Sequence, residues 1–286
     1  MNQIEMGISK ALAYADVFDF PLTQEEIFAW YIGKRAVSRP AITTALVQMS
    51  QRQMVDRSGV YYCLPGKEQL VVWRKNKLRS STEKYVRAKR MATLLAKAPG
   101  VRGIFLTGSA AVDNAPADDD IDLMIITQNS RLWTTRLWIT GMLEMMGVRR
   151  QPEQAQIQNR FCVNLYLDET EMTVEPEFQN LYTAHEVVLA KSLWERKHLS
   201  ARFLQANRWV RDYLPNTVIP TTKYPNPPLQ TPGILEKVCY QLQKMYMRQK
   251  MTRERVSGRV AYFHPRDMAK IVLGRYHQRL KDYAIN

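Results

Sequence analysis

The residues best suited to chemistry lie between two apolar runs, in the segment GSAAVDNAPADDDID that begins at Gly108. A glycine and a serine open the segment. It ends with four aspartates at positions 118, 119, 120 and 122, in a chain whose net charge is +14. Carboxylates so close together repel one another unless a positive charge or water lies among them. The way in which this local charge is neutralised decides how the segment is interpreted.

Asp120 and Asp122 lie at the start of the apolar run Leu123–Ile126. Side chains of a β-strand alternate between faces, so the two carboxylates are predicted to point the same way, about 6.5–7 Å apart along the strand. Such a pair favours a divalent cation, which screens the repulsion. We expect Mg2+ or Mn2+ there, with a solvated charge cluster at the strand edge as the alternative. Asp118 and Asp119 are expected to be solvated loop acids.

Gly108 and Ser109 are predicted to end one strand and begin a short helix. Glycine allows a tight turn and a close approach by a ligand, and backbone N–H groups at the start of a helix attract phosphate. An anion site would then lie beside the metal site. A nucleoside triphosphate (NTP) with its Mg2+ matches that pair of sites.

Because it contains Gly108-Ser109 followed by Asp120 and Asp122, the segment resembles the signature of the DNA polymerase beta superfamily of nucleotidyltransferases. That signature is Gly-Ser, about ten residues, then Asp, a hydrophobic residue and Asp leading into an apolar strand. Here the ten residues 110–119 separate Ser109 from Asp120. The similarity extends from about Val101 to Thr173.

The resemblance implies a metal-dependent enzyme that moves a nucleoside monophosphate from an NTP to an acceptor hydroxyl and releases pyrophosphate. Asp120 and Asp122 would be catalytic and hold the metal, and Gly108 and Ser109 would bind phosphate. The chain would then hold a nucleotidyltransferase-like mixed sheet flanked by helices. The acceptor, the preferred nucleotide and the oligomeric state are not specified by the sequence.

The superfamily usually has a third carboxylate on the next core strand, which is predicted here at residues 160–168. The acid is expected about where Asn164 stands, and an amide is an uncharged ligand and a poor base. Asp168 shares the strand face but lies about 13 Å along it. The third position is therefore open between Asn164 and Asp168, and a site that binds nucleotide without fast transfer is a further possibility.

Two arginines beyond the second strand, Arg131 and Arg136, are candidates for contacts with the triphosphate tail, and an exposed helix face is the alternative. The three cysteines are few and far apart, which predicts neither a disulfide framework nor a zinc site. The histidines show no paired spacing typical of metal ligands. They are expected at the surface: His185, His198, His264 and His277.

The elements that must position these residues begin with an N-terminal winged-helix-like region. PLTQEEIFAWYI predicts a helix capped by Thr23 and Glu26, and a second helix is predicted after Ser38. Ser58 and Gly59 predict the turn of a short hairpin. Two helices followed by a ribbon resemble a winged helix-turn-helix. The second helix has a predicted buried stripe of Ile42, Ala45, Leu46 and Met49.

The middle of the chain alternates between helix and strand, which predicts an α/β (α+β) fold. A basic helix over 81–98 is predicted to bury one face: Tyr85, Ala88, Met91, Leu94 and Leu95. The predicted strands are 101–108, 120–127 and 160–168, with 171–175 as a candidate partner of the last. The predicted helices are 131–147, 180–197 and 200–213.

We expect four parts along the chain. They are a winged-helix-like domain (1–75), a nucleotidyltransferase-like domain (76–214), a linker with six prolines (215–233) and a basic helical C-terminal tail (234–286). No run approaches the roughly 18 apolar residues of a membrane span, and the first residues do not resemble a signal peptide. A cytoplasmic protein without a membrane partner is the expectation.

Basic residues are concentrated in two blocks. Residues 67–102 contain 11 Lys or Arg against 2 Asp or Glu, and residues 234–286 contain 12 against 4. Such blocks are either solvated helix faces or a surface for nucleic acid or nucleotide phosphate. The alternative function is therefore a catalytically degenerate nucleotidyltransferase-like protein that acts as a nucleic-acid-binding or regulatory subunit.

Overall fold

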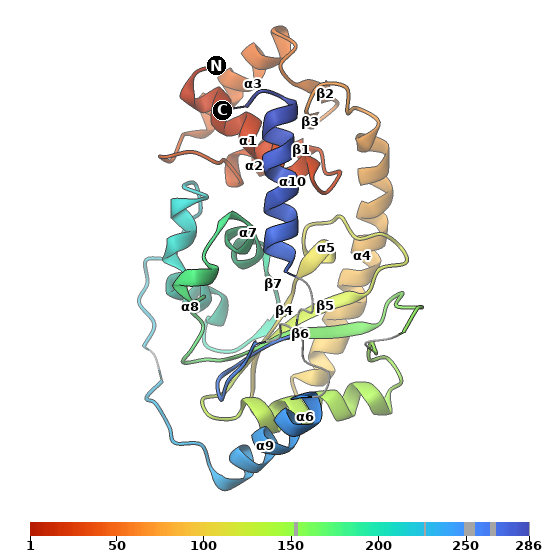
Figure 1. Ribbon diagram of the computed structural model, residues 1–286, viewed down its shortest axis with the longest axis vertical. Coiled ribbons are helices and arrows are strands. Elements are labelled where there is room, and N and C mark those ends of the chain that lie inside the picture. Colours follow the sequence, from red (N-terminus) through yellow and green to blue (C-terminus); the bar gives the residue numbers. More distant parts are fainter. Residues whose placement is uncertain (152–153, 226, 249–254, 264–266, 286) are drawn as a thin grey trace.

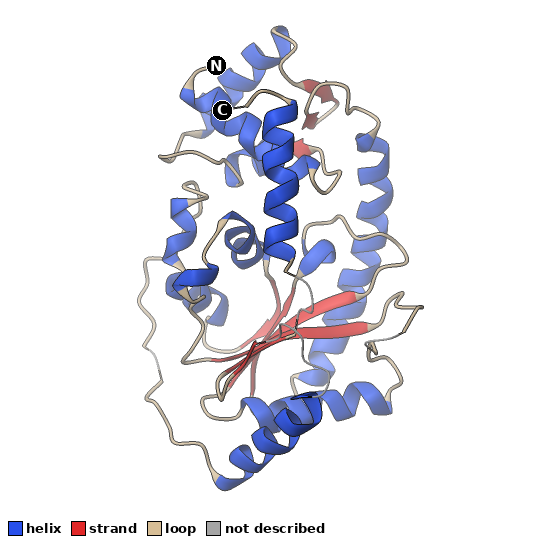
Figure 2. Ribbon diagram, viewed as in Figure 1, coloured by secondary structure: helices blue, strands red, loops and turns tan. Residues whose placement is uncertain are grey.

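The computed structural model describes residues 1–286 except 152–153, 226, 249–254, 264–266 and 286. It has a mixed sheet flanked by helices, beneath an N-terminal part made mostly of helices (Figure 1 and Figure 2). The α/β class predicted from the alternation of elements is confirmed.

The N-terminal part contains two helices that the sequence predicts and one that it does not. The unpredicted helix is α1 (Gln3–Asp16), and the others are α2 (Gln24–Ala29) and α3 (Arg39–Gln51). Thr23 and Glu26 form the predicted capping box, and Ser38 caps α3. The predicted apolar stripe of α3 is buried. Short strands β1 (Leu22–Thr23), β2 (Asp56–Ser58) and β3 (Tyr61–Cys63) pair antiparallel in the order β1-β3-β2.

Helix α4 (Leu70–Leu95) is longer than predicted and buries a different face. Ala88, Met91 and Leu95 are buried as expected, but Tyr85 and Leu94 are exposed, so that part of the prediction is wrong. The buried line continues through polar residues, including Ser81 and Lys84, which a hydrophobic pattern cannot reveal. Those polar residues bind the loop that carries the aspartates.

The central sheet has six strands in the order β7-β4-β5-β6-β9-β8, and only β5 and β6 are parallel among the pairs described. The first three along the chain are β4 (Val101–Leu106), β5 (Ile121–Thr127) and β6 (Phe161–Asp168), as predicted. The others are β7 (Lys191–Glu195), β8 (Arg255–Val256) and β9 (Val260–Tyr262). Segment 171–175 is not a strand.

Helices cover both faces of this sheet (Figure 1). Ile104, Leu123 and Ile125 pack in one core with residues of α4, α6 (Leu132–Met145) and α9 (Ile234–Arg248). Phe105, Met124 and Ile126 pack in the other with the N-terminal part. That second core also contains residues of α7 (Leu181–Leu189), α8 (Leu199–Ala206) and α10 (Met268–Asp282).

Two predictions for the second half of the chain are wrong. The single helix expected at 180–197 is α7 followed by β7, because KSLWE pairs with the free edge of β4. The C-terminal region is not only helical, since β8 and β9 extend the sheet beside β6. Segment 200–213 contains α8 and the 3-10 turn η2 (Arg208–Asp212), and a further 3-10 turn, η1, covers Pro176–Phe178.

The proline-rich segment 215–233 contains no helix or strand among its described residues, as predicted. Its carbonyl groups accept hydrogen bonds from the turn after β5: Asn129 donates to Pro228 and Ser130 to Gln230. Helix α10 then returns to the N-terminal part (Figure 1). There Arg279 forms an ion pair with Asp16 at 2.6 Å. No described helix combines the length and apolarity needed to cross a bilayer.

Candidate functional site

Strand β5 brings Asp120 and Asp122 together, as the alternation of a strand predicts. Their carboxylate oxygens and the Sγ atom of Cys162 lie within 4.8 Å of one another. Cys162 reaches this position because β6 runs parallel to β5 with Cys162 opposite Asp122. Two carboxylates and a thiol therefore converge at the start of the two parallel strands.

Asp120 is buried and paired with a cation that the sequence analysis did not identify. Only 4% of its side chain is exposed, and Oδ2 lies 2.6 Å from Nη1 of Arg150. Burial raises the pKa of Asp120, while the charge of Arg150 opposes that rise. Arg150 itself is held beside β6 by a hydrogen bond from its N–H to the carbonyl of Phe161 at 2.9 Å.

Asp122 has no such cation partner among the described residues. Its Oδ1 atom accepts a hydrogen bond from Nδ2 of Asn164 at 2.9 Å. Burial, and then the charges of Asp120 and Asp119, raise the pKa of Asp122 to about 8. Near neutral pH the carboxyl group is largely protonated, so a bound cation would displace a proton from it.

Gly108 and Ser109 lie directly beside this carboxylate pair. Gly108 has a φ of +64°, and a Cβ atom on it would lie 2.6 Å from Oδ2 of Asp122. The turn therefore needs glycine for two reasons, the left-handed backbone and the contact with Asp122. The Ser109 hydroxyl donates to Oδ2 of Asp119 at 2.5 Å. Asp119 is thus half-buried and bonded, which corrects its prediction as a solvated acid, whereas Asp118 is exposed as expected.

A lysine of α4 holds the acidic loop in place. Lys84 is 1% exposed, and its ammonium group donates to the carbonyls of Ala117 at 3.2 Å and Asp119 at 2.7 Å, and to Oδ1 of Asn159 at 3.2 Å. One turn earlier, Ser81 Oγ accepts a hydrogen bond from the N–H of Ala115 at 2.9 Å. A buried positive charge thus lies behind the aspartates, as their mutual repulsion requires.

The carboxylates of Asp120 and Asp122, Cys162 and the turn at Gly108 line one cavity of about 980 Å³. Its walls include Gly108, Ser109, Asp119, Asp120, Asp122 and Asn164. Three arginines line it as well: Arg136, Arg149 and Arg150. A group of aromatic residues from α1, from the segment before α3 and from α7 forms a further wall. The cavity therefore combines carboxylates, cations and an aromatic surface.

The structure separates the remaining predicted residues. Arg136 lines the cavity, but it donates to Gln243 and lies over the ring of Phe263 at 4.6 Å. Arg131 is exposed, caps α6 and does not line the cavity. Asp168 is at the opposite end of β6, fully buried, and accepts hydrogen bonds from Ser130 and Thr170. It does not reach Asp122.

Asn164 occupies the place where the family resemblance predicts the third acid. The register of β5 and β6 shifts here, because Leu123 lies opposite Val163 whereas Met124 lies opposite Leu165. Asn164 is the extra residue of this bulge, and its side chain donates a hydrogen bond to Asp122. The position is therefore filled by a neutral hydrogen-bond donor.

Several residues of the cavity were missed by sequence reasoning. Arg150 follows α6 with no spacing that pairs it with Asp120, and the cysteines were considered only for disulfides and zinc, so Cys162 was not expected at this site. His185 was expected at the surface but is 2% exposed, and Glu186 beside it also lines the cavity. His264 lies outside the described residues.

The donor set fits a divalent cation that prefers oxygen. Carboxylates suit Mg2+ and Mn2+, whereas a thiol is a soft ligand that binds as the thiolate. Burial and the neighbouring carboxylates Asp122 and Asp120 raise the pKa of Cys162 to about 12, so its thiol is protonated at neutral pH. Asp120 and Asp122 are the residues that would hold the ion, with Cys162 as a neighbour.

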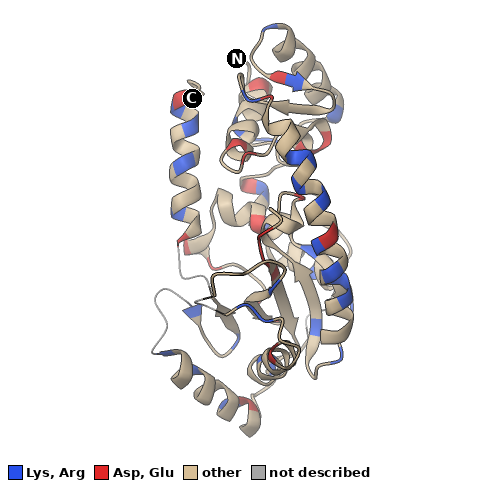
Figure 3. Cartoon of the chain, turned by 90° about the vertical axis from the view of Figure 1, so that its right-hand side faces the viewer, with Lys and Arg blue, Asp and Glu red and all other residues tan. Residues whose placement is uncertain are grey.

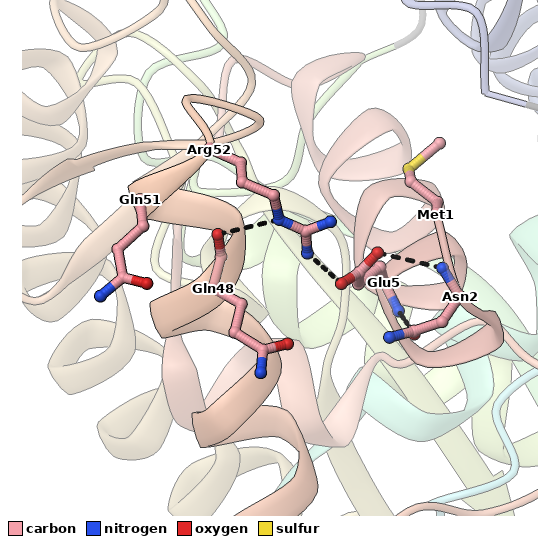
Figure 4. Close-up of a pocket in the computed structure, with 6 residues that line it drawn as sticks. All are labelled: Met1, Asn2, Glu5, Gln48, Gln51 and Arg52. Atoms are coloured by element: carbon pink, nitrogen blue, oxygen red, sulfur yellow. Dashed lines mark hydrogen bonds and ion pairs between the residues drawn. The ribbon is translucent and has the colours of Figure 1, made fainter.

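A second hollow lies on the N-terminal part, between α1 and α3 (Figure 4). Its charged groups satisfy one another. Arg52 donates to the carboxylate of Glu5 and to the carbonyl of Gln48, and Glu5 accepts from the N–H of Asn2 at 3.0 Å (Figure 4). Because the charged residues described in this hollow, Glu5 and Arg52, pair with each other, the cavity at Asp122 is the candidate site.

Comparison of the chain with models of protein families, with curated proteins and with solved structures gives no match.

Proposed function

We propose that this protein is a metal-dependent nucleotidyltransferase, which transfers a nucleoside monophosphate from an NTP to an acceptor hydroxyl. The observation that carries the proposal is the contact between Gly108 and Asp122, with Asp120 beside them. This contact places a turn that a phosphate can approach closely beside a pair of carboxylates. Too little positive charge surrounds the two carboxylates to balance them. The fold class and the strand–turn–helix–strand order around the site are consistent with the family resemblance.

In this proposal the residues of the cavity have different roles. Asp120 and Asp122 would hold a divalent ion, whose charge would be available to the phosphates and to the oxygens that enter and leave. Gly108 would let the triphosphate approach. Arg150 and Arg149, which form ion pairs with Asp120 and Glu144, also line the cavity and would add positive charge near the phosphates. Most of the rate enhancement would come from positioning and electrostatics.

The test compares variants of adjacent aspartates. Purified protein is incubated with α-labelled NTPs and Mg2+ or Mn2+, with and without candidate acceptors, and Mn2+ binding is measured by calorimetry. Asp120→Asn and Asp122→Asn should abolish both nucleotide transfer and Mn2+ binding. The control is Asp118→Asn, which removes the same charge from an exposed position of the same loop. The proposal fails if the wild type binds neither Mn2+ nor NTP, or if the Asp118 and Asp122 variants behave alike.

The second candidate, nucleic-acid binding by an inactive member of the same family, is favoured by one observation. Helix α4 carries many basic residues (Figure 3), and several exposed ones have exposed aromatic residues among them. They are Lys75, Arg79, Arg87 and Arg90, with Trp73 and Tyr85. The order of helices followed by a hairpin also supports a winged-helix-like N-terminal part. Duplex binding that weakens with salt and survives Asp120→Asn with Asp122→Asn would favour this candidate, and no binding at about 50 mM salt would remove it.

A further inference from the structure

The end of the cavity formed by α1 and α7 contains a buried hydrogen-bond acceptor without a partner. Nδ1 of His185 lies 2.9 Å from the carbonyl oxygen of Leu181. A carbonyl only accepts, so Nδ1 carries the hydrogen and Nε2 has the lone pair. Nε2 is buried and has no hydrogen-bond partner among the described residues. Burial lowers the pKa of His185 to about 4, so the ring is neutral at pH 7.

Glu186 adds a second acceptor at the same end. It lines the cavity, and no hydrogen bond or ion pair to its carboxyl group occurs within the part of the chain that the structure describes. Burial raises the pKa of Glu186 to about 7, so above that pH its carboxylate only accepts hydrogen bonds. A ligand at this end would therefore have to present N–H or O–H donors to both residues.

The surrounding walls are aromatic and carry no cation. Tyr14 stacks on His185 with ring centroids 3.9 Å apart, and Trp30 meets the same ring edge-on at 5.8 Å. Phe18, Phe20 and Tyr182 also line this end. None of the described lining residues from α1, from residues 18–30 or from α7 is Lys or Arg. This end therefore suits a flat ring with donors at its edge and does not suit a phosphate.

We propose that this end of the cavity is a nucleobase subsite, in which His185 and Glu186 accept hydrogen bonds from the amino or ring N–H groups of the base. This inference rests on the proposed function, because the same cavity would hold the triphosphate of that nucleotide. Guanine, adenine and cytosine each carry an exocyclic amino group. Uracil has one N–H between two carbonyls, which would face the acceptor atoms of the protein.

The first test is the affinity of the Mn2+ complexes of ATP, GTP, CTP and UTP, measured by calorimetry at pH 8, where Glu186 is mostly ionised. The best amino-bearing nucleotide should bind at least about 10-fold more tightly than UTP, because an unpaired buried acceptor is costly. Glu186→Gln should reduce this difference to less than about 3-fold, because an amide both donates and accepts. Glu177→Gln, which changes an exposed glutamate, is the control and should keep the wild-type ranking.

A second variant separates recognition from stability. His185→Phe keeps a ring against Tyr14 but removes the unpaired lone pair. We expect it to lose base discrimination while its melting temperature without ligand stays the same or rises. A lower melting temperature with an unchanged base ranking would show that His185 only supports the fold, and the inference would be overturned.

Binding tests with nucleosides, which carry no phosphate, distinguish this inference from the proposed function. Adenosine, guanosine, cytidine and uridine are tested without metal by saturation-transfer NMR. The predicted ranking among the nucleosides would support the subsite even if no triphosphate bound. In one outcome, the wild type and Glu186→Gln both bind all four Mn2+–NTP complexes tightly and with equal affinity. That result would overturn the subsite and leave the transferase proposal intact. Absence of both nucleoside and triphosphate binding would overturn both.

Discussion

Gly108 lies against Asp122 so closely that no side chain fits between them. An ideal Cβ atom on Gly108 would lie 2.6 Å from Oδ2 of Asp122, and the φ of Gly108 is +64°. We expect Gly108→Ala to push the carboxylate away and to strain the backbone. The free energy of unfolding should fall by about 1–3 kcal/mol, measured by urea denaturation. Calorimetry should show a loss of Mn2+ affinity of about 10-fold or more.

The control for this variant is Gly141→Ala in helix α6, where a Cβ atom would meet nothing within 4 Å. Alanine in a helix is favoured over glycine, so this variant should gain up to about 1 kcal/mol and keep its Mn2+ affinity. Wild-type Mn2+ affinity in Gly108→Ala would show that the contact does not position Asp122.

The raised pKa of Asp122 predicts how stability depends on pH. Burial, with the charges of Asp120 and Asp119, raises this pKa from 3.8 to about 8. The folded protein therefore holds a proton that the unfolded chain releases, so the stabilisation is complete below about pH 4 and is lost as the pH rises to about 8. In EDTA, Asp122→Asn should show a weaker fall in the free energy of unfolding over this range than the wild type.

At pH 8 the asparagine variant should be more stable than the wild type by at least about 1 kcal/mol, since one pKa unit corresponds to about 1.4 kcal/mol. Mn2+ should reverse the order, because it stabilises only the protein that binds it. Urea titrations at pH 5 and pH 8, with EDTA or Mn2+, measure both effects. Parallel pH dependences of the wild type and the variant would contradict the assignment of this proton to Asp122.

The sequence predicted the strands that carry the site because their apolar runs are continuous and their ends are marked. Because side chains alternate along a strand, the start of β5 fixes the direction of Asp120 and Asp122. Gly108 is a local signal for the turn beside them. Arg150 and Lys84 could not be predicted in the same way. Arg150 binds Asp120, which is 30 positions away, and Lys84 binds the carbonyl of Asp119, which is 35 positions away. Each therefore neutralises the acidic loop from a distant part of the sequence.

Strand β7 and the bulge at Asn164 were missed for a different reason. KSLWE follows a helix without a turn signal, and it becomes a strand because the edge of β4 is free to pair with it. The bulge shifts the register of β6 by one residue, which strict alternation cannot anticipate. His185 lies on an apolar helix face, and its unpaired Nε2 becomes visible only when the helix is packed.

Lys84 should be essential for the structure of the acidic loop. Lys84→Met keeps the length of the side chain but leaves the carbonyls of Ala117 and Asp119 without their buried donor. We expect the free energy of unfolding to fall by about 2–4 kcal/mol, because more than one buried acceptor loses its partner. Lys75→Met, at an exposed position of the same helix, should change it by less than about 0.5 kcal/mol. Similar unfolding free energies for the two variants would show that Lys84 does not hold the loop.

Asp168 should matter for stability and not for metal binding. It is fully buried and accepts hydrogen bonds from the N–H of Ser130 at 2.6 Å and from the N–H and hydroxyl of Thr170 at 2.9 and 2.6 Å. Asp168→Ala leaves these donors unpaired and should cost about 2–4 kcal/mol of unfolding free energy. Calorimetry should still give a Mn2+ affinity within about 2-fold of the wild type, because ligand identity and charge at the site are unchanged. A large loss of Mn2+ affinity with little loss of stability would make Asp168 a ligand after all.

Asn164 is the position at which the site can be completed. Its Nδ2 atom lies 2.9 Å from Oδ1 of Asp122, so Asn164→Asp would bring a third carboxylate against the pair. Without metal the added repulsion should lower the melting temperature, and more strongly at pH 8 than at pH 5, because ionised carboxylates repel. Mn2+ affinity should rise by about 10-fold or more, since the charge of the ligand set controls the affinity for hard cations. Asn164→Leu is the control of similar volume and should lower the affinity or leave it unchanged. If Asn164→Asp loses stability at pH 8 but gains no Mn2+ affinity, the cation does not lie between the two strands, and the assignment of Asp122 as a ligand is wrong.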